Sequence, residues 1–219
     1  MEQYDELRAA DRETAGKMLA QRFVRNRFAN TVVVGIATGG VPVASAIADR
    51  LEAPLEVMSC RAIKNPADPA RNIGSVSADE IYLQDSPFGP SKDNLYLQIV
   101  RLRNEIKYEN EFYYGHRTEL DFTGKNVIVV DDLLTSPDTL MVAIREIRKQ
   151  RPARLTVAVP FVEAEAARQI QSACDELVFL KMKQRISSPF EFYNEFSVVN
   201  DWSVRDILRA TQPELVVAS

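Results

Sequence analysis

The stretch Asn126-Val-Ile-Val-Val-Asp-Asp-Leu-Leu-Thr-Ser-Pro-Asp-Thr139 decides the fold of this chain. Four consecutive β-branched residues, 127–130, are typical of a short strand that is buried on both faces of a parallel sheet. The strand ends in two carboxylates, Asp131 and Asp132. Apolar residues then recur at helical spacing, at Leu140, Met141, Ile144 and Ile147. The stretch therefore predicts a strand, a loop and a helix, with acids at the carboxyl end of the strand, where open α/β sheets bind ligands.

A second strand, followed by a glycine pair, precedes this stretch. Residues 31–36, Thr-Val-Val-Val-Gly-Ile, have the composition of a buried strand, and Ala37-Thr38-Gly39-Gly40 follows. Pro42 fits the first turn of the next helix, where its missing N–H removes no hydrogen bond. The glycine pair lets backbone N–H groups approach an anion at the helix N-terminus. Such glycines also serve a turn alone, so both interpretations stay open.

Strands and helices alternate along most of the chain. Further strands are expected at 55–60, 155–159 and 176–180, and a further helix at 164–173. This alternation predicts an α/β protein with a doubly wound central parallel sheet of about five strands and helices on both faces. We expect strands 31–36 and 127–131 to be adjacent and parallel at the sheet centre, because both lead to candidate ligand loops.

The segments outside this alternation are expected to form elaborations of one domain that covers residues 1–219. Residues 5–28 predict a helix, with Asp11 capping a restart within it. Residues 61–75 are polar, basic and broken by prolines, as in a surface loop. The candidate loop or hood elaborations are 61–120 and 181–200.

The later parts of these elaborations, and the segment that follows them, contain a helical pattern and many aromatic residues. A helical stripe from Leu95 to Tyr113 leaves Glu109 largely facing water. The aromatic-rich segment 189–196 is expected to pack over the sheet or to form part of a hood. Asp201 is expected to cap a last helix. We assign no role to His116.

Composition and charge exclude several classes of function. With 219 residues the chain can bury a sizeable core, and its net charge of −4 disfavours general binding of nucleic acid. No apolar run is long enough to cross a bilayer, and no secretory signal pattern is present, so a cytoplasmic protein is expected. Cys60 and Cys174 resemble core residues of a reducing compartment. One histidine and no Cys-x-x-Cys make a metal site of Cys and His unexpected.

The opening stretch resembles the signature with which type I phosphoribosyltransferases bind phosphoribosyl pyrophosphate (PRPP). That signature has four apolar residues, two acids, three variable residues and then Thr-Gly-x-Thr. The segments 39–44, Gly-Gly-Val-Pro-Val-Ala, and 51–57 resemble a bacterial group of predicted phosphoribosyltransferases. The likeness continues at Ile73, Gly74, Tyr193, Phe196, Val199, Asp201 and Val204. It implies a parallel sheet with a small hood, a phosphoribosyl or nucleotide-like ligand, and possible homodimers.

The resemblance implies transfer of a phosphoribosyl group from PRPP to a nitrogen base, with release of pyrophosphate. The acid pair, here Asp131 and Asp132, would hold the ribose hydroxyls and form the catalytic pair. Mg²⁺ would be held mainly through PRPP and water. Positioning and charge stabilisation carry most of such chemistry, so the loops matter more than any single acid or base.

Three segments are implied to bind the substrate. The loop after the acids would bind the 5-phosphate through Thr135, Ser136, Asp138 and Thr139. The loop after the first strand would bind pyrophosphate through Thr38, Gly39 and Gly40. Two cations in the segment 61–75, Arg61 and Lys64, are further candidates for binding the substrate.

The chain departs from the family pattern at three places. Thr38 and Ala62 stand where the family and the bacterial group carry cations, and Ser-Pro-Asp-Thr replaces Thr-Gly-x-Thr at 136–139. Ser136, Pro137 and Asp138 form a good helix start, with Ser136 as the N-cap and Asp138 near the first-turn amides. A proline has no N–H to donate to a phosphate, and the acid would repel one. Two hypotheses result: an active phosphoribosyltransferase, or an inactive protein of the same fold that binds a ligand or regulates.

Overall fold

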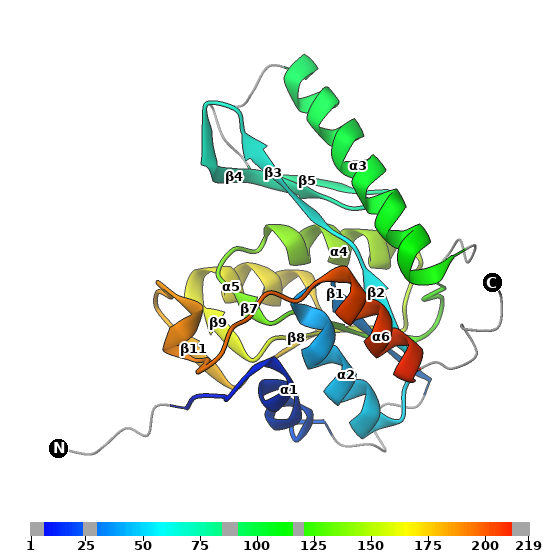
Figure 1. The fold of residues 1–219 in the computed structure, drawn as a ribbon, viewed down its shortest axis with the longest axis vertical. Helices are drawn as coiled ribbons and strands as arrows, with labels where there is room; N and C mark the ends of the chain where they lie inside the picture. The colour runs from blue at the N-terminus through cyan, green and yellow to red at the C-terminus, as the bar shows by residue number, and fades with distance from the viewer. Residues whose placement is uncertain (1–6, 24–29, 85–91, 116–120, 212–219) are drawn as a thin grey trace.

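A five-stranded parallel sheet forms the centre of the computed structural model, which describes residues 7–23, 30–84, 92–115 and 121–211 (Figure 1). Its strands are β1 (Thr31–Ile36), β2 (Leu55–Met58), β6 (Asn126–Val130), β8 (Arg154–Ala158) and β10 (Glu176–Val178). They lie in the order β10–β8–β6–β1–β2. β1 and β6 pair in parallel inside the sheet, with Val33 opposite Ile128. The predicted fold class and the predicted pairing of these two strands are confirmed.

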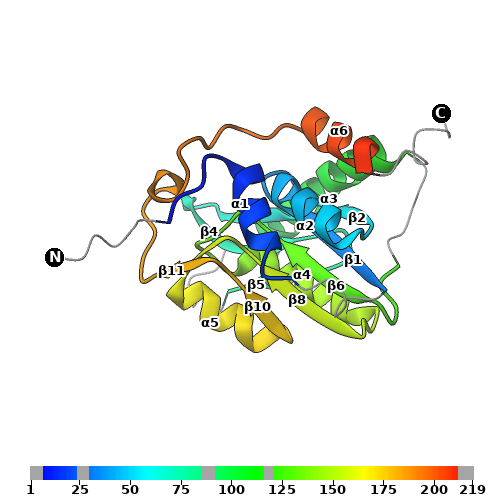
Figure 2. The same cartoon turned by 90° about the horizontal axis from the view of Figure 1, so that it is seen from below.

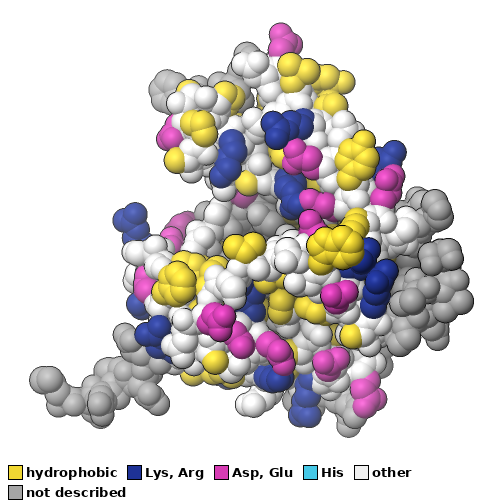
Figure 3. Space-filling model, in the orientation of Figure 1, with side chains coloured by type: hydrophobic (Ala, Val, Ile, Leu, Met, Phe, Trp, Pro, Cys, Tyr) yellow, Lys and Arg dark blue, Asp and Glu magenta, His cyan; other side chains and the backbone are white. Residues whose placement is uncertain are grey.

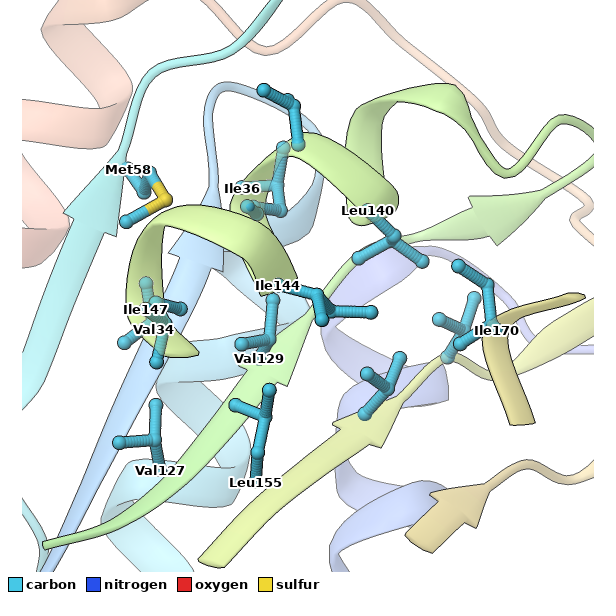
Figure 4. Packing of buried hydrophobic residues seen from close by; sticks show 14 of the residues in the cluster. Val34, Ile36, Met58, Val127, Val129, Leu140, Ile144, Ile147, Leu155 and Ile170 are labelled. Carbon is cyan, nitrogen blue, oxygen red and sulfur yellow. The ribbon is translucent and has the colours of Figure 1, made fainter. Parts of the chain in front are cut away.

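Helices cover both faces of this sheet because its strands are apolar on both sides. These helices are α1 (Arg12–Ala20), α2 (Gly40–Leu51), α4 (Asp138–Lys149), α5 (Ala164–Ala173) and α6 (Asp201–Thr211). Val127 and Val129 of β6 belong to the hydrophobic cluster with α4 and α5. Ile128 and Val130 belong to the cluster with α1, α2 and α6. Figure 4 shows the first cluster, where Ile144 of α4 lies over Val129.

Three strands of the central sheet are each followed, after a short interruption, by a second strand, and these second strands form a small sheet of their own. β7 (Leu133–Leu134), β9 (Phe161–Glu163) and β11 (Lys181–Lys183) follow β6, β8 and β10 and pair in the order β11–β9–β7. Asp131 and Asp132 occupy the interruption between β6 and β7. Pro160, which has no N–H for a ladder, lies in the interruption between β8 and β9. The sequence pattern did not predict this continuation.

A hood of three antiparallel strands and a long helix lies above the sheet in Figure 1. It consists of β3 (Arg61–Asn65), β4 (Asp68–Val76), β5 (Ile81–Leu83) and α3 (Lys92–Tyr114). The predicted surface loop at 61–75 was wrong, because Ile63, Ile73 and Val76 pack with Ile106 of α3 in a hydrophobic cluster of their own. The first half of β4 is exposed, so its sequence lacks the apolar alternation by which strands are recognised.

Polar contacts fasten the hood to α4. Glu146 of α4 accepts hydrogen bonds from the Ser77 hydroxyl and from the Asp79 amide. Lys149, near the end of the same helix, pairs with Glu80. The turn between β4 and β5 is therefore fixed on α4, and the end of β5 lies beside the first turn of that helix.

The start of the described chain lies beside the aromatic segment at 189–196 (Figure 2). Ala9 forms a parallel bridge with Tyr193, and the Ala9 amide donates to the Phe192 carbonyl at 2.8 Å. The helix expected over 5–28 is shorter: α1 begins at Arg12, and Asp11 caps it by accepting from the Thr14 amide at 2.7 Å. Residues 5, 6 and 24–28 of that expectation lie outside the described residues.

The last helix, α6, is capped by Asn200 and not by Asp201 as predicted. The Ser203 amide donates to Asn200 Oδ1 at 2.9 Å. The Asp201 carboxylate instead accepts a hydrogen bond from the Tyr113 hydroxyl of α3. Among the helices in the described ranges, none has the length and apolar character needed to cross a membrane.

Candidate functional site

A cavity of about 450 Å³ opens where β1 and β6 end. β1 continues through α2 to β2, and β6 continues through α4 to β8, so the two connections run in opposite directions along the sheet. Doubly wound sheets bind ligands at such a switch point. The lining includes Arg12, Thr38, Gly39, Cys60, Asp131, Asp132, Thr139, Phe196, Val198 and Val199. In the space-filling view the molecule is hollowed between the hood and the part that contains the sheet (Figure 3).

The acid pair lies on the floor of this cavity, at the end of β6. The Asp132 amide donates to Asp131 Oδ1 at 2.9 Å, and the Tyr193 hydroxyl donates to the Asp132 carbonyl at 2.7 Å. Burial, and after it the negative charge of Asp132, raise the pKa of the Asp131 carboxyl well above its usual value. The two side chains line the cavity as hydrogen-bond acceptors, which suits a ligand that carries hydroxyl groups.

Arg12, the first residue of α1, lies far from the acids in the sequence and contacts one of them. Its Nε donates to Asp132 Oδ2 at 2.6 Å, and the two side chains are only 11% and 14% exposed. Its Nη1 donates to the Ser197 carbonyl at 2.6 Å, and its guanidinium lies 3.6 Å from the ring centre of Phe196. One carboxylate of the acid pair is therefore neutralised by a cation, and the other is not.

The glycine pair between β1 and α2 lies directly against the acid pair. A Cβ added at Gly39 would collide with the Asp132 carboxylate, and one at Gly40 would lie 2.5 Å from the Val130 carbonyl oxygen. A side chain at either position would push the loop away from β6. α2 begins at Gly40 with no side-chain cap and no acid in its first turn. The Val41 amide donates to the Thr38 carbonyl at 3.3 Å, and the other N–H groups of the first turn can donate to an anion.

The start of α4 differs from the prediction. The helix begins at Asp138, with Pro137 at the N-cap position and no side-chain cap, so the prediction that Ser136 caps it was wrong. Asp138 is 1% exposed, and Gln84 Nε2 donates to its two carboxylate oxygens at 3.0 and 2.8 Å. The carboxylate thus accepts hydrogen bonds from Gln84, the residue that follows β5, whereas the sequence pattern placed it near the first-turn amides.

Arg61 and Lys64 serve the hood and are not among the cavity-lining residues. Arg61 forms an ion pair with Glu109 of α3. The expectation that Glu109 largely faces water was wrong, because its side chain is 15% exposed. Lys64 Nζ donates to Asn72 Oδ1 at 2.7 Å within the β3–β4 hairpin.

The structure brings five of the sequence-predicted residues together at the cavity: Thr38, Gly39, Asp131, Asp132 and Thr139. Gly40 lies behind them against β6, while Thr135 and Ser136 are exposed. His116 lies outside the described residues.

Arg12 was not predicted from the sequence as a residue of the site. One signal was available: a cation in the first turn of a helix is electrostatically unfavourable, so an arginine there suggests another partner. Val198, 92% exposed as a residue, was also missed, and nothing in its sequence context pointed to the cavity.

Within the described ranges, no group of three or more His, Cys, Asp or Glu side chains could hold a metal ion. The cavity presents two neighbouring carboxylates, and one of them is paired with Arg12. This donor set is too small to enclose a divalent cation by itself.

A cavity at the switch point of a doubly wound sheet, with paired acids on its floor and a hood nearby, defines an α/β protein with a candidate ligand site lined by hydrogen-bond acceptors. Residues 3–190 match the model of the phosphoribosyl transferase domain, and the chain belongs to that family.

Two relatives place the chain more closely. A Mycobacterium tuberculosis protein whose name assigns it provisionally to the phosphoribosyl transferases is 27% identical over 195 residues. This match covers 87% of the present chain and 44% of the mycobacterial protein, so the chain spans less than half of that relative. The crystal structure of TT1426 from Thermus thermophilus is 29% identical, with a TM-score of 0.77 over 92% of this chain and 98% of that one.

Proposed function

We propose that this protein is a phosphoribosyltransferase that transfers the phosphoribosyl group of PRPP to a nitrogen base and releases pyrophosphate. The observation that carries the proposal is that the acid pair and the open N-terminus of α2 share one cavity. The acids supply acceptors for ribose hydroxyls, and the N–H groups of α2 supply donors for an anion. The ribose and the pyrophosphate of PRPP thus each have a complementary surface.

The chain's own groups would act by positioning and by charge. Asp131 and Asp132 would fix the ribose, and the loop 37–40 would receive the leaving pyrophosphate close to it. Holding C1 between a bound pyrophosphate and a bound base lowers the entropic cost of the reaction. The apolar residues Phe196, Val198 and Val199 on the cavity wall would cover one face of a planar base.

Mg²⁺ fits this site as an ion carried by the substrate. The chain presents too few carboxylates in the described ranges to enclose it, and Mg²⁺ commonly keeps several waters and binds substrate phosphates. When bound in this way, the ion neutralises charge on the pyrophosphate. The residues of the chain then need only to receive the complex of ion and PRPP.

A second candidate is a protein of this family that binds a ligand without turnover. The buried Asp138 favours it, because a carboxylate at the start of α4 opposes a 5-phosphate there. Unit charges about 5 Å apart repel by roughly 3 kcal/mol at an effective dielectric constant of 20. The two candidates differ in turnover and share the ribose site.

Calorimetric titration with PRPP and Mg²⁺, followed by a pyrophosphate-release assay with purine and pyrimidine bases, separates the two. We expect binding, and release with at least one base. Asp131→Asn with Asp132→Asn should abolish binding, while Asp49→Asn with Asp206→Asn, the same charge change at two exposed residues, should not. Binding without release for every base favours the second candidate, and failure to bind PRPP contradicts the proposal.

A further inference from the structure

We infer that Arg12 binds the pyrophosphate moiety of the ligand and supplies the cation of this cavity. The inference rests on the function proposed above and assigns to the N-terminal helix a part in substrate binding. It gives the Arg12–Asp132 ion pair a role beyond fastening α1 to the end of β6.

The balance of charge in the cavity supports this role. Among the described residues that line the cavity, Arg12 is the only Lys or Arg, and it faces two carboxylates. A pyrophosphate group carries several negative charges, which backbone N–H groups alone balance poorly. Position 38, next to the glycine pair, is a threonine, and Arg61 and Lys64 are engaged in the hood. The positive charge at this end of the cavity therefore comes from α1.

The position of the guanidinium supports the same role. Arg12 Nε donates to Asp132 Oδ2, and that same oxygen is the atom with which a Cβ on Gly39 would collide. One carboxylate oxygen, Asp132 Oδ2, therefore lies between the guanidinium and the loop 37–40. Its bonds to Asp132 and to the Ser197 carbonyl use two of the five N–H donors of an arginine. In the described structure this leaves donors for a phosphate oxygen beside the start of α2.

The Arg12 side chain is also held in place before a ligand arrives. Asp11 caps α1, and the helix packs on α2 so closely that a Cβ on Gly16 would lie 2.8 Å from the Val43 carbonyl oxygen. Phe196 covers one face of the guanidinium. Arg12 occupies the first turn of its helix, where the helix dipole disfavours a cation, and Asp132 offsets this cost. A preorganised guanidinium loses little entropy on binding an anion.

The test compares pyrophosphate affinity, measured by calorimetry with Mg²⁺, in Arg12→Gln and in the unmodified protein. We expect the affinity to fall about tenfold or more, because a charge-assisted hydrogen bond to the ligand is lost. Lys17→Gln is the matched control: it removes the same charge from the same helix, at an exposed residue paired with Glu13, and should change nothing. Adding Thr38→Arg to Arg12→Gln should restore much of the affinity, a rescue that a purely structural role would not permit.

The possible outcomes are distinguishable. If the unmodified protein binds neither PRPP nor pyrophosphate, the proposed function and this inference both fail. If it binds pyrophosphate and Arg12→Gln binds it equally well or more tightly, the inference alone is wrong, and in the second case Arg12 blocks the site. If Arg12→Gln does not fold, Arg12→Lys should stay within a few-fold of the unmodified protein. Pyrophosphate should also protect Arg12 of the unmodified protein from an arginine-specific dicarbonyl, and labelling that is unchanged by pyrophosphate would overturn the inference.

Discussion

Two helices, α2 and α4, begin at the same edge of the sheet, and their first turns carry opposite properties. The start of α2 has no acid and no side-chain cap, and its glycines lie against the acid pair. The start of α4 has a proline at the N-cap position and a buried acid, Asp138, as its first residue. Since a helix N-terminus attracts anions, α2 keeps that capacity and α4 opposes it with a negative charge of its own.

Under the proposed function, this difference predicts which part of PRPP the chain would bind more tightly. The ribose and pyrophosphate parts of PRPP would meet acceptors, open N–H groups and Arg12. The 5-phosphate part would meet Asp138, whose carboxylate is tied to Gln84 at the end of β5. The hood thus contacts the start of α4 through this hydrogen bond, so a change in the hood would also affect the start of α4.

The largest expected effect on stability and on affinity comes from displacing the loop 37–40, which precedes α2. In Gly40→Ala, the added Cβ would lie 2.5 Å from the Val130 carbonyl oxygen, a backbone atom that cannot move aside. We expect unfolding in urea to show a loss of about 1–3 kcal/mol, as for other overpacked sites. PRPP affinity should fall about a hundredfold because the loop is displaced.

Ser45→Ala, a change in the same helix at a half-buried residue, serves as the control and should alter neither property strongly. If Gly40→Ala were stable and still bound PRPP normally, the loop 37–40 would not be a ligand loop. The comparison of the two helices would then lose its first half.

The second expected effect is a gain of phosphate affinity at the start of α4. Asp138→Asn removes the negative charge and keeps an oxygen that can accept from Gln84. We expect ribose 5-phosphate and PRPP to bind about tenfold more tightly, because the repulsion of the 5-phosphate is removed. Calorimetry measures this directly.

Asp49→Asn makes the same charge change at an exposed residue of α2, away from the hood, and should leave affinity unchanged. Weaker binding in Asp138→Asn would mean that the acid assists the ligand instead of repelling it. Pro137→Gly added to Asp138→Asn should increase the gain only modestly, since it restores one N–H donor.

The third expected effect is a pH dependence that comes from the acid pair. The pKa of Asp131 is raised, and only its ionised form accepts hydrogen bonds from hydroxyls at both oxygens. Affinity for ribose 5-phosphate should therefore rise, by about fivefold, as pH increases through that raised pKa. The folded protein binds this proton more tightly than the unfolded chain, whose carboxyl titrates near the usual 3.8. The contribution of Asp131 to stability should accordingly fall as pH rises from 3.8 to the raised pKa, and should change little above it.

Asp131→Asn is the control for titration of the ligand itself and should remove this part of the pH profile. Arg12 lowers the pKa of Asp131, so Arg12→Gln should move the midpoint to higher pH. A profile that is identical in the unmodified protein and in Asp131→Asn would show that this carboxyl does not contact the ligand.

The sheet could be predicted from the sequence, and much of the rest could not, for physical reasons. Residues 127–130 are apolar on both faces, and that local composition alone marks a buried parallel strand. The hood strands are half exposed and carry no such mark. The pairing of Arg12 with Asp132 joins residues 120 positions apart, so it depends on the packing of α1 and not on local pattern. The local pattern predicted a cap at Ser136. In the structure α4 begins at Asp138, whose side chain accepts a hydrogen bond from Gln84, a residue distant in the sequence.

The smallest expected effect tests that failed prediction. Ser136 is exposed and makes no capping bond, so Ser136→Ala should change the free energy of unfolding by less than about 0.5 kcal/mol. Asn200→Ala is the matched comparison, because Asn200 does accept a first-turn amide of α6, and its loss should cost about 1 kcal/mol. PRPP affinity in Ser136→Ala should stay within twofold if the start of α4 is a poor phosphate site. A marked loss of affinity with unchanged stability would instead mean that the Ser136 hydroxyl binds the 5-phosphate. The loop at 135–139 would then be a working phosphate site, and the contrast between the two helices would be one of degree.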